Sequence, residues 1–469
     1  MLEIPQLGET LKETRSRCPE CLKECEGRVW KSEGEKSKVY LSRSCPEHGD
    51  TTVCIASDAR FYWLSKGSDD GGCGVGCACS ADPLGMDGTL GKNALAAVGE
   101  DAGKQPEEVM EVLSTCLALI EIVDSCNLSC PTCFAASPVG VGAKLDAKPL
   151  EDIIMRVKGV LKRKGNIEIL QLSGGEPSLH PDLLELLDWI DGEPRIDYCL
   201  LNTNGVMLAK DDNFLTEIGK RARRGNFQLY LQFDGLQDAG QKELRGADLR
   251  KLKKEVMNRC EREQIPVTLA TTVNEDNLSH LWEIVEFGLE YAVCRGVAMQ
   301  PMFLSGRNPE NDDTRTPVRR LNTADIIIGC VEQSDKMLRY EDFTPLPCGD
   351  PNCATIGYLL RTPLGVKSIS EFIDFSQLQG FLRDKVRYEL SDLQSCGCEN
   401  TELGELLHQF EMKEEHAFRL FIKPFMDAWT WDQDRIDRCC THVIRPDGKL
   451  DSFCRYYSGF PDTFSNLKS

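Results

Sequence analysis

Three closely spaced cysteines form the most distinctive chemical group in the sequence, Cys126-x3-Cys130-x2-Cys133. Ferredoxin-type runs such as C-x2-C-x2-C-x3-C supply four thiolates for iron–sulfur clusters. The residues after Cys133 are Phe-Ala-Ala-Ser, which supply no fourth thiolate. Three thiolates leave one iron of a four-iron cluster open, and an open metal position is typical of catalytic sites. We therefore expect a catalytic cluster here; the alternative is a zinc or structural site completed by a distant residue.

Further cysteines gather near both ends of the chain. The N-terminal zone contains Cys18-x2-Cys21, Cys45-Pro-Glu-His and Cys73-x3-Cys77-x-Cys79. The C-terminal zone contains Cys348, Cys353, Cys396, Cys398, Cys439, Cys440 and Cys454. Single cysteines in apolar or helical contexts are expected to be buried core side chains; these are Cys116, Cys199, Cys260, Cys294 and Cys330.

Length and charge narrow the class of protein. The 469 residues include 23 cysteines and carry a formal net charge of −20. A chain this long can bury a core without disulfide staples, and its acidity argues against bulk binding of nucleic acid. The N-terminus lacks an apolar signal-peptide core, and no apolar run reaches the roughly 18 residues of a membrane span. We expect a cytoplasmic protein, in which clustered thiols stay reduced and bind metal.

The segment 114–305 alternates apolar strands with amphipathic helices. Strands are predicted over 116–123, 167–173, 198–203, 227–233, 266–273 and 296–302. Helices are predicted over 149–161, 182–190, 214–221, 249–263 and 278–291. This alternation indicates a parallel sheet with right-handed crossovers. Six units fit a partial barrel better than a closed barrel of eight.

The flanking regions have different patterns. Residues 1–70 resemble a small cysteine-rich ribbon, and the Gly-rich segment 71–113 is expected to be a cluster-binding linker. Residues 306–469 are expected to form a C-terminal region that carries additional clusters. Within it, helices are predicted over 323–338, 368–382 and 400–418.

Polar residues follow several of the predicted barrel strands. As an isolated motif, Gly-Gly-Glu-Pro would be an ordinary turn. Here it ends the second strand, beside the cysteine loop, and glycine lets the backbone approach a ligand closely. Polar residues at the carboxyl ends of successive strands are typical of an active-site rim. The candidates are Gly174, Gly175, Glu176, Asn202, Asn204, Gln232 and Asp234.

The cysteine loop, the following Phe134, the Gly-Gly-Glu-Pro turn and the barrel order together resemble the radical S-adenosylmethionine (radical SAM) superfamily. The resemblance implies a [4Fe–4S] cluster on Cys126, Cys130 and Cys133, whose open iron is chelated by S-adenosylmethionine. It further implies that S-adenosylmethionine is cleaved reductively to a 5′-deoxyadenosyl radical, which abstracts hydrogen. The electrons would come from a donor such as ferredoxin or flavodoxin. By this resemblance Gly174, Gly175 and Glu176 contact the methionine amine. Asn202, Asn204, Gln232 and Asp234 are then candidates for the rest of S-adenosylmethionine or for substrate.

Motifs outside the barrel narrow the resemblance to one branch. The segments CPEC, CPEHG, 347–353, 425–430 and 438–454 resemble tetraether lipid synthases, some relatives of which are labelled pterin methyltransferases. The branch implies two auxiliary [4Fe–4S] clusters and one mononuclear rubredoxin-type iron. We assign Cys18, Cys21 and Cys45 to the mononuclear site, with a fourth ligand from residues 73–79. The remaining metal-ligand candidates are Cys73, Cys77, Cys348, Cys353, Cys439, Cys440 and Cys454.

Several alternatives stay open at this level. Zinc is the alternative to iron in the ribbon, because a tetrahedral sulfur site suits both metals. His48 and His442 are alternative ligands, although an exposed or hydrogen-bonded histidine is the more usual role. Adjacent Cys439 and Cys440 cannot easily both face one cluster. The run Cys73-x3-Cys77-x-Cys79 also departs from the C-x3-C-x2-C expected of the branch.

The resemblance leads to a first hypothesis and its alternatives. The first is carbon–carbon coupling of lipid alkyl chains, which requires an apolar tunnel and allows peripheral contact with a membrane. Candidate tunnel walls, which core packing would also explain, are Phe421, Ile422, Phe425, Met426, Trp429 and Trp431. The alternatives are radical methylation or other modification of a pterin-like small molecule, and modification of a peptide. The expected protein is thus α/β, with a partial (β/α)6 radical SAM barrel between a cysteine-rich ribbon and an auxiliary-cluster region.

Overall fold

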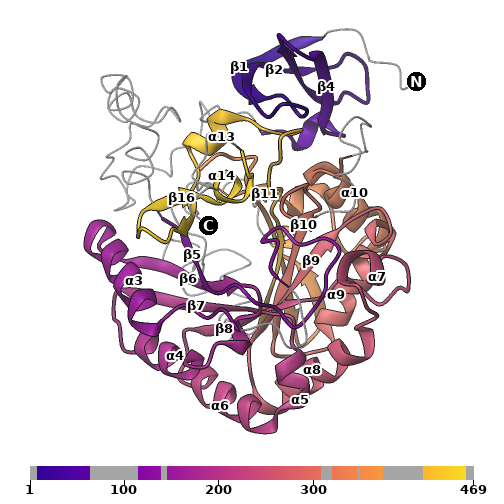
Figure 1. Ribbon diagram of the computed structural model, residues 1–469. Coiled ribbons are helices and arrows are strands. Elements are labelled where there is room, and N and C mark those ends of the chain that lie inside the picture. The colour runs from indigo at the N-terminus through magenta and orange to yellow at the C-terminus, as the bar shows by residue number, and fades with distance from the viewer. Residues whose placement is uncertain are drawn as a thin grey trace, which may run out of the picture.

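The computed structural model describes residues 8–63, 115–138, 145–307, 320–346, 349–372 and 416–460. These residues form an N-terminal ribbon, a central barrel and C-terminal strands that join the barrel sheet (Figure 1). The predicted linker 71–113 and most of the helices predicted over 368–382 and 400–418 lie outside the described residues.

Six parallel strands form the barrel in sequential order, as the alternation of apolar runs predicts. Each strand pairs in parallel with the next one along the chain, so the carboxyl ends of all six strands meet on one side. The strands are β5 (Leu117–Val123), β6 (Ile167–Gly174), β7 (Ile196–Thr203), β8 (Phe227–Gln232), β9 (Val267–Val273) and β10 (Cys294–Pro301).

Amphipathic helices cover the outer face of these strands (Figure 1). In α3 the buried residues Ile153, Val157, Val160 and Leu161 share one face, at the spacing a helix requires. The helices are α3 (Leu150–Lys164), α4 (Leu183–Asp191), α5 (Val206–Lys210), α6 (Asp212–Ala222), α7 (Gln241–Arg245), α8 (Arg250–Glu263), α9 (Leu281–Leu289) and α10 (Thr323–Gln333). Among the described helices, none is both long enough and apolar enough to cross a bilayer.

The C-terminal region extends the barrel sheet at both edges. Strand β14 (Ala417–Ile422) pairs in parallel with β10, and β15 (Thr441–Ile444) pairs in parallel with β5. These pairings satisfy backbone groups that edge strands would otherwise leave open. The sequence patterns do not predict these strands. The smaller elements are β11 (Thr344–Pro345), β12 (Thr355–Thr362), β13 (Gly365–Ser368), α13 (Gln433–Asp437), β16 (Leu450–Ser452) and α14 (Phe453–Tyr457).

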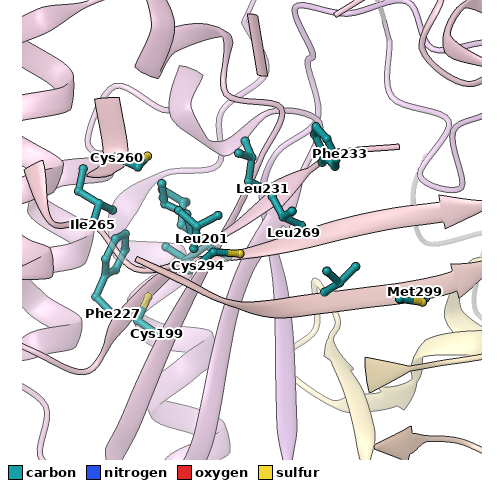
Figure 2. Close-up of a cluster of buried hydrophobic side chains, with 14 of the residues drawn as sticks. Cys199, Leu201, Phe227, Leu231, Phe233, Cys260, Ile265, Leu269, Cys294 and Met299 are labelled. Carbon is teal, nitrogen blue, oxygen red and sulfur yellow. The ribbon is translucent and has the colours of Figure 1, made fainter. Parts of the chain in front are cut away.

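Several single cysteines are core side chains, as expected. Figure 2 shows Cys199, Cys260 and Cys294 among apolar residues of the barrel, and Cys330 is equally buried. Cys116 is buried too, but it is disulfide-bonded, so its expected role as a plain core thiol is wrong.

The N-terminal ribbon is a four-stranded antiparallel sheet in the order β1-β2-β3-β4. It contacts the C-terminal region, where Ser16 Oγ donates to the Trp431 carbonyl (2.6 Å) and Arg43 donates to the Ala428 carbonyl (2.6 Å). The strands are β1 (Glu9–Arg17), β2 (Glu24–Lys31), β3 (Val39–Cys45) and β4 (Gly49–Ala56). The ribbon and the end of the chain therefore form one packed unit above the barrel (Figure 1).

Candidate active site

Cys126, Cys130 and Cys133 lie in the loop that follows β5, at the carboxyl side of the barrel. All three line a cavity of about 300 Å³ that opens between the barrel strands and the C-terminal region. The placement matches the expectation that catalytic groups of parallel barrels lie at the ends of the strands.

Hydrogen bonds hold the cysteine loop in place from several sides. The Leu128 amide donates to Cys126 Sγ (3.4 Å), and Asn204 Nδ2 donates to Asn127 Oδ1 (2.7 Å). Arg307 donates through Nε to the Cys130 carbonyl (2.8 Å), and its own carbonyl accepts from the Cys133 amide (2.8 Å). These hydrogen bonds give the loop a defined shape.

The chemistry of the thiols fits a metal cluster. Burial raises the pKa of Cys126 to about 11 and also raises the pKa of Cys130. Because metals bind thiolates, cluster binding here must release protons. Three thiols converge on the cavity from one loop, which is the donor set that a four-iron cluster with one open iron requires.

Gly174 and Gly175 bring β6 into direct contact with the start of the cysteine loop. A Cβ on Gly174 would lie 2.1 Å from the Val123 carbonyl oxygen, and a Cβ on Gly175 would lie 2.1 Å from that of Ser125. Gly174 also has a φ of +123°, which favours glycine. Both glycines line the cavity, as predicted for residues that contact a ligand.

Glu176 is buried, and its carboxylate accepts hydrogen bonds that connect the turn after β6 to the end of β7. Its Oε1 accepts from the Ser178 amide (3.1 Å), the Ser178 hydroxyl (2.6 Å) and the Thr203 hydroxyl (2.7 Å). Its Oε2 accepts from the Asn204 amide (2.7 Å). A carboxylate offers about four acceptor sites, so only Oε2 keeps capacity for the predicted methionine amine.

The amide side chains predicted at the rim line the cavity. Asn202 accepts from Gln171 Nε2 (2.7 Å) and donates to Ser173 Oγ (3.1 Å). Among the described residues, nothing donates a hydrogen bond to the buried Oε1 of Gln232. Asn202, Asn204 and Gln232 therefore remain candidates for ligand contacts, and Gln232 has the clearest need of a partner.

Asp234 does not have the predicted role. It is absent from the cavity wall and instead pairs with Arg245 at 2.5 Å and 2.7 Å through both carboxylate oxygens. The Asp234 carboxylate also accepts from the Thr272 amide (3.0 Å). Since Asp234 is buried in this ion pair and does not line the cavity, its role in the structure is to hold Arg245.

Basic residues behind the cysteine loop were missed by the sequence reasoning. Arg245 from α7, Lys253 from α8 and Arg307 after β10 all reach the loop or the turn beside it. They follow the cysteines by more than a hundred residues and form no motif with them. Their sequence positions therefore carry no signal for this role.

A second group of thiols lies in the C-terminal region, beyond the far wall of the cavity. Burial, with help from Cys353 and Cys454 nearby, raises the pKa of Cys439 to about 12. Lys423 is close to all three thiols and also lines the cavity. Its Nζ donates to the Thr441 hydroxyl and lies 5.6 Å from the centre of the Phe425 ring. The predicted ligands Cys353, Cys439 and Cys454 thus share one electrostatic environment around Lys423.

Other predicted ligands are placed differently. Cys440 is disulfide-bonded, as is Cys116, so its thiolate is not available to a metal in this structure. His442 is buried and bridges Thr115 Oγ1 (2.9 Å) and the Cys439 carbonyl (2.8 Å). Burial lowers its pKa to about 3, so His442 is a neutral, hydrogen-bonded core residue. Cys73, Cys77 and Cys348 lie outside the described residues.

The predicted tunnel walls divide into two sets. Phe421 and Phe425 line the cavity, and Phe134, Phe303 and Phe453 join Phe425 there. In contrast, Ile422, Met426 and Trp431 are core residues with at most 2 % of their surface exposed. Trp429 lies beneath the Arg320 guanidinium, 5.8 Å from it. Only part of the expected apolar stripe faces the cavity.

The ribbon holds a separate metal-binding group. One ligand atom each from Cys18, Cys21, Cys45 and His48 lies within 4.8 Å of every other. His48 Nδ1 is 3.6 Å from the Sγ atoms of both Cys18 and Cys45. Within the described residues, His48 is the fourth donor beside the three cysteines, and the cysteine expected from residues 73–79 lies outside the described residues. Three cysteines and one histidine form a common tetrahedral zinc set.

Comparison with known families agrees with this architecture. The model of the Radical SAM superfamily matches residues 120–288. This part of the chain is a radical SAM domain. The model named HMPTM N-terminal zinc ribbon domain matches residues 10–57. The protein is thus a radical SAM enzyme with a zinc-ribbon-like N-terminal domain.

Individual relatives cover the chain to different extents. The 7,8-dihydro-6-hydroxymethylpterin dimethyltransferase of Methanocaldococcus jannaschii is 26 % identical over 95 % of this chain and 93 % of its own length. The PqqA peptide cyclase of Gluconobacter oxydans is 31 % identical over 38 % of this chain and 47 % of its own. Among solved structures, Streptococcus suis SuiB bound to S-adenosylmethionine covers 52 % of this chain and 53 % of its own, with 14 % identity and a TM-score of 0.36.

Proposed function

We propose that this radical SAM enzyme methylates or otherwise modifies a small, pterin-like heteroaromatic molecule. The observation that carries the proposal is the group of hydrogen-bonding side chains at the barrel end of the cavity. This reverses the order of the two substrate hypotheses that the sequence suggests, because coupling of lipid alkyl chains would need an apolar tunnel.

Hydrogen-bonding side chains occupy the barrel end of the cavity. Tyr198 donates to Gln228 Oε1 (3.1 Å), and Gln300 Nε2 donates to the Tyr230 hydroxyl (2.8 Å). All four residues line the cavity, as does Gln232 with its unsatisfied Oε1. A pterin presents ring N–H groups, ring nitrogens and a carbonyl, so it can pair with such a wall.

An alkyl chain could not pair with these groups. A buried polar atom left without a partner costs about 1–3 kcal/mol, and a saturated chain would leave Gln232 Oε1 in that state. The similarity to the pterin dimethyltransferase also extends over 95 % of the chain. Both observations support a heteroaromatic substrate.

The other end of the cavity favours an apolar or planar group. Phe425 stacks on Phe453 with ring centres 4.0 Å apart, and Phe134 lies 5.4 Å from Phe453. A flat aromatic ring fits such a wall by stacking. The same wall is the specific observation in favour of the second candidate, lipid chain coupling.

Different residues of the site would bind the cluster, border its open side and exclude water. Cys126, Cys130 and Cys133 would hold a [4Fe–4S] cluster, and Gly174, Gly175 and Oε2 of Glu176 would border its open side. When bound, the cluster and S-adenosylmethionine supply an organic radical that removes hydrogen from an unactivated C–H bond. The phenylalanine wall would exclude water from that radical.

Three further metal sites belong to the proposal. Cys353, Cys439 and Cys454 would carry one auxiliary cluster, with Cys348 as the candidate fourth ligand and Lys423 offsetting negative charge. Cys18, Cys21, Cys45 and His48 would bind zinc. A second auxiliary cluster would depend on Cys73 and Cys77. A reductant such as ferredoxin or flavodoxin would supply the electron.

Product analysis tests this proposal. The full-length protein is reconstituted anaerobically with iron and sulfide, and given dithionite and S-adenosylmethionine labelled in its methyl group. We expect one molecule of S-adenosylmethionine to give 5′-deoxyadenosine and methionine, and a second to give S-adenosylhomocysteine while its labelled methyl group appears in an added 6-hydroxymethyl-7,8-dihydropterin. Cys126→Ala should abolish 5′-deoxyadenosine and the labelled pterin, whereas Cys260→Ala, a buried cysteine far from the cavity, should not.

The outcomes separate the candidates. A lipid product without any pterin product would contradict the pterin proposal and support chain coupling. Absence of 5′-deoxyadenosine from a cluster-loaded wild type would contradict both. Gln232→Leu should weaken pterin turnover at least tenfold while leaving uncoupled 5′-deoxyadenosine formation intact, since about 1.4 kcal/mol corresponds to a factor of ten.

A further inference from the structure

Arg245 lies directly behind Cys130, on an element that is clamped to the cysteine loop. It ends α7, and Gly246 follows with a φ of +74°. A Cβ on Gly246 would lie 2.7 Å from the Ser129 carbonyl oxygen. Thr132 Oγ1 donates to the Leu244 carbonyl (3.1 Å). These contacts therefore hold the end of α7 against the cysteine loop.

Buried partners fix the guanidinium of Arg245. Nε and Nη2 donate to the two Asp234 oxygens at 2.5 Å and 2.7 Å, and Nη2 also donates to the Thr272 hydroxyl (3.0 Å). The side chains of Arg245 and Asp234 are only 8 % and 3 % exposed. Since a guanidinium has five N–H groups, these contacts leave the Nη1 edge for another acceptor.

The positive charge of Arg245 lies near the Cys130 thiol and counteracts the rise that burial causes in the pKa of that thiol. The loop contacts Leu244 and Gly246, the residues on either side of Arg245, and these contacts keep Arg245 next to the loop. In a water-poor environment such a fixed charge is weakly screened. Hydrogen bonds to cluster sulfurs and nearby charge are among the factors that set cluster reduction potentials.

We propose that Arg245, held by Asp234, raises the reduction potential of the cluster through the positive charge that it keeps beside Cys130. This inference rests on the proposed cluster at Cys126, Cys130 and Cys133. One-electron reduction adds negative charge to the cluster and its thiolates. A fixed positive charge beside Cys130 stabilises the reduced form more than the oxidised form. Arg245 thus acts through Cys130, and it affects how easily the cluster accepts an electron.

The test is a redox titration of the reconstituted full-length protein, followed by electron paramagnetic resonance, without S-adenosylmethionine. Cys126→Ala identifies the signals of other iron sites, which are subtracted. We expect Arg245→Met to keep its iron and sulfide content but to lower the midpoint potential by at least a tenfold change in the reduction equilibrium, about 59 mV for one electron. Arg245→Lys should recover most of the loss.

Arg250→Met is the matched control, because Arg250 pairs with Asp238 and Asp248 on the exposed side of α8, away from the loop. It should leave the potential unchanged. An unchanged midpoint in cluster-loaded Arg245→Met would overturn the inference. If Arg245→Met holds too little iron, the midpoint potentials of Arg245→Lys and Arg245→Gln are compared instead. Equal midpoint potentials in these two variants overturn the inference. A lower midpoint potential in Arg245→Gln than in Arg245→Lys supports it. If wild type and Cys126→Ala give the same electron paramagnetic resonance signals, the proposed cluster at Cys126, Cys130 and Cys133 is contradicted.

Discussion

Lys253 shows how much a single buried charge shapes the surroundings of the cysteine loop. It is 4 % exposed, and its Nζ donates to the Asn204 carbonyl (2.6 Å). Burial, followed by the nearby Arg245, lowers its pKa to about 8 from an ordinary value of 10.5. Burial of the Lys253 charge beside the Asn204 turn therefore lowers the stability of the folded protein.

This cost predicts a pH-dependent stability. Between pH 8 and 10.5 the unfolded chain keeps the Lys253 proton and the folded chain loses it, so stability rises with pH in that window. Wild type should gain up to about 3 kcal/mol relative to Lys253→Met between pH 7.5 and 10.5. Urea unfolding at a series of pH values measures this. A constant difference between the two proteins would show that the lysine does not titrate there.

At the scale of elements, the turn after β6 and the cysteine loop depend on close backbone contact. The Gly175 amide donates to the Val123 carbonyl (2.7 Å), and the Glu176 amide donates to the Ser125 carbonyl (3.0 Å). A side chain at Gly175 would push these segments apart. The turn therefore sets the position of the first cluster ligand, Cys126.

Gly175→Ala should destabilise the fold by about 1–3 kcal/mol, the usual cost of overpacking, because its Cβ would lie 2.1 Å from the Ser125 oxygen. It should also lower the iron content after reconstitution. Gly159→Ala in α3 is the control, with no atom nearer than 3.5 Å, and should stabilise by about 0.5–1 kcal/mol. Thermal melts and iron analysis report both effects; full iron binding by Gly175→Ala would contradict the assigned role of the turn.

The ribbon metal site joins two turns, β1–β2 and β3–β4. We expect elemental analysis of the purified protein to find stoichiometric zinc, and His48→Ala to lose most of it, since three thiolates leave the tetrahedral site incomplete. His280→Ala is the matched control, because His280 is partly exposed, pairs with Glu283 (3.0 Å) and lies outside the ribbon. Zinc retained by His48→Ala would point instead to a fourth cysteine.

At the scale of the whole molecule, one arginine couples the ribbon to the end of the chain. Arg43 is 3 % exposed and donates to the carbonyls of Arg17 (3.0 Å), Ala428 (2.6 Å) and Trp429. Lys12 adds an ion pair with Asp432 (2.6 Å). These contacts tie the zinc ribbon to the segment that leads from β14 to α13.

Arg43→Met should free the ribbon from the C-terminal segment, because three buried carbonyls lose their donor at about 1–3 kcal/mol each. We expect faster hydrogen exchange in both 9–56 and 426–437, with the barrel strands unchanged. Arg15→Met, which removes an exposed pair with Glu24 (3.3 Å), should change stability by less than about 1 kcal/mol. Equal exchange in both variants would mean that Arg43 does not couple the two parts.

Local patterns were sufficient to predict the barrel. Each strand of β5–β10 is an apolar run, and each covering helix has a buried stripe such as that of α3, so the information lies within about fifteen residues. The strands β14 and β15 are short, and their partners lie far away in sequence, as in the pairing of Val443 with Leu119. No local pattern encodes that pairing, so the sheet extensions could not be predicted.

The same division holds in the site. The spacing of Cys126, Cys130 and Cys133 by itself predicts a three-thiolate metal loop, because cluster chemistry constrains neighbouring ligands directly. Only the tertiary structure shows that Asp234 pairs with Arg245, that His48 lies among Cys18, Cys21 and Cys45, and that amides from separate strands line one cavity. These assignments depend on side chains from separate strands and turns meeting within hydrogen-bond distance, and the folded backbone alone sets those distances.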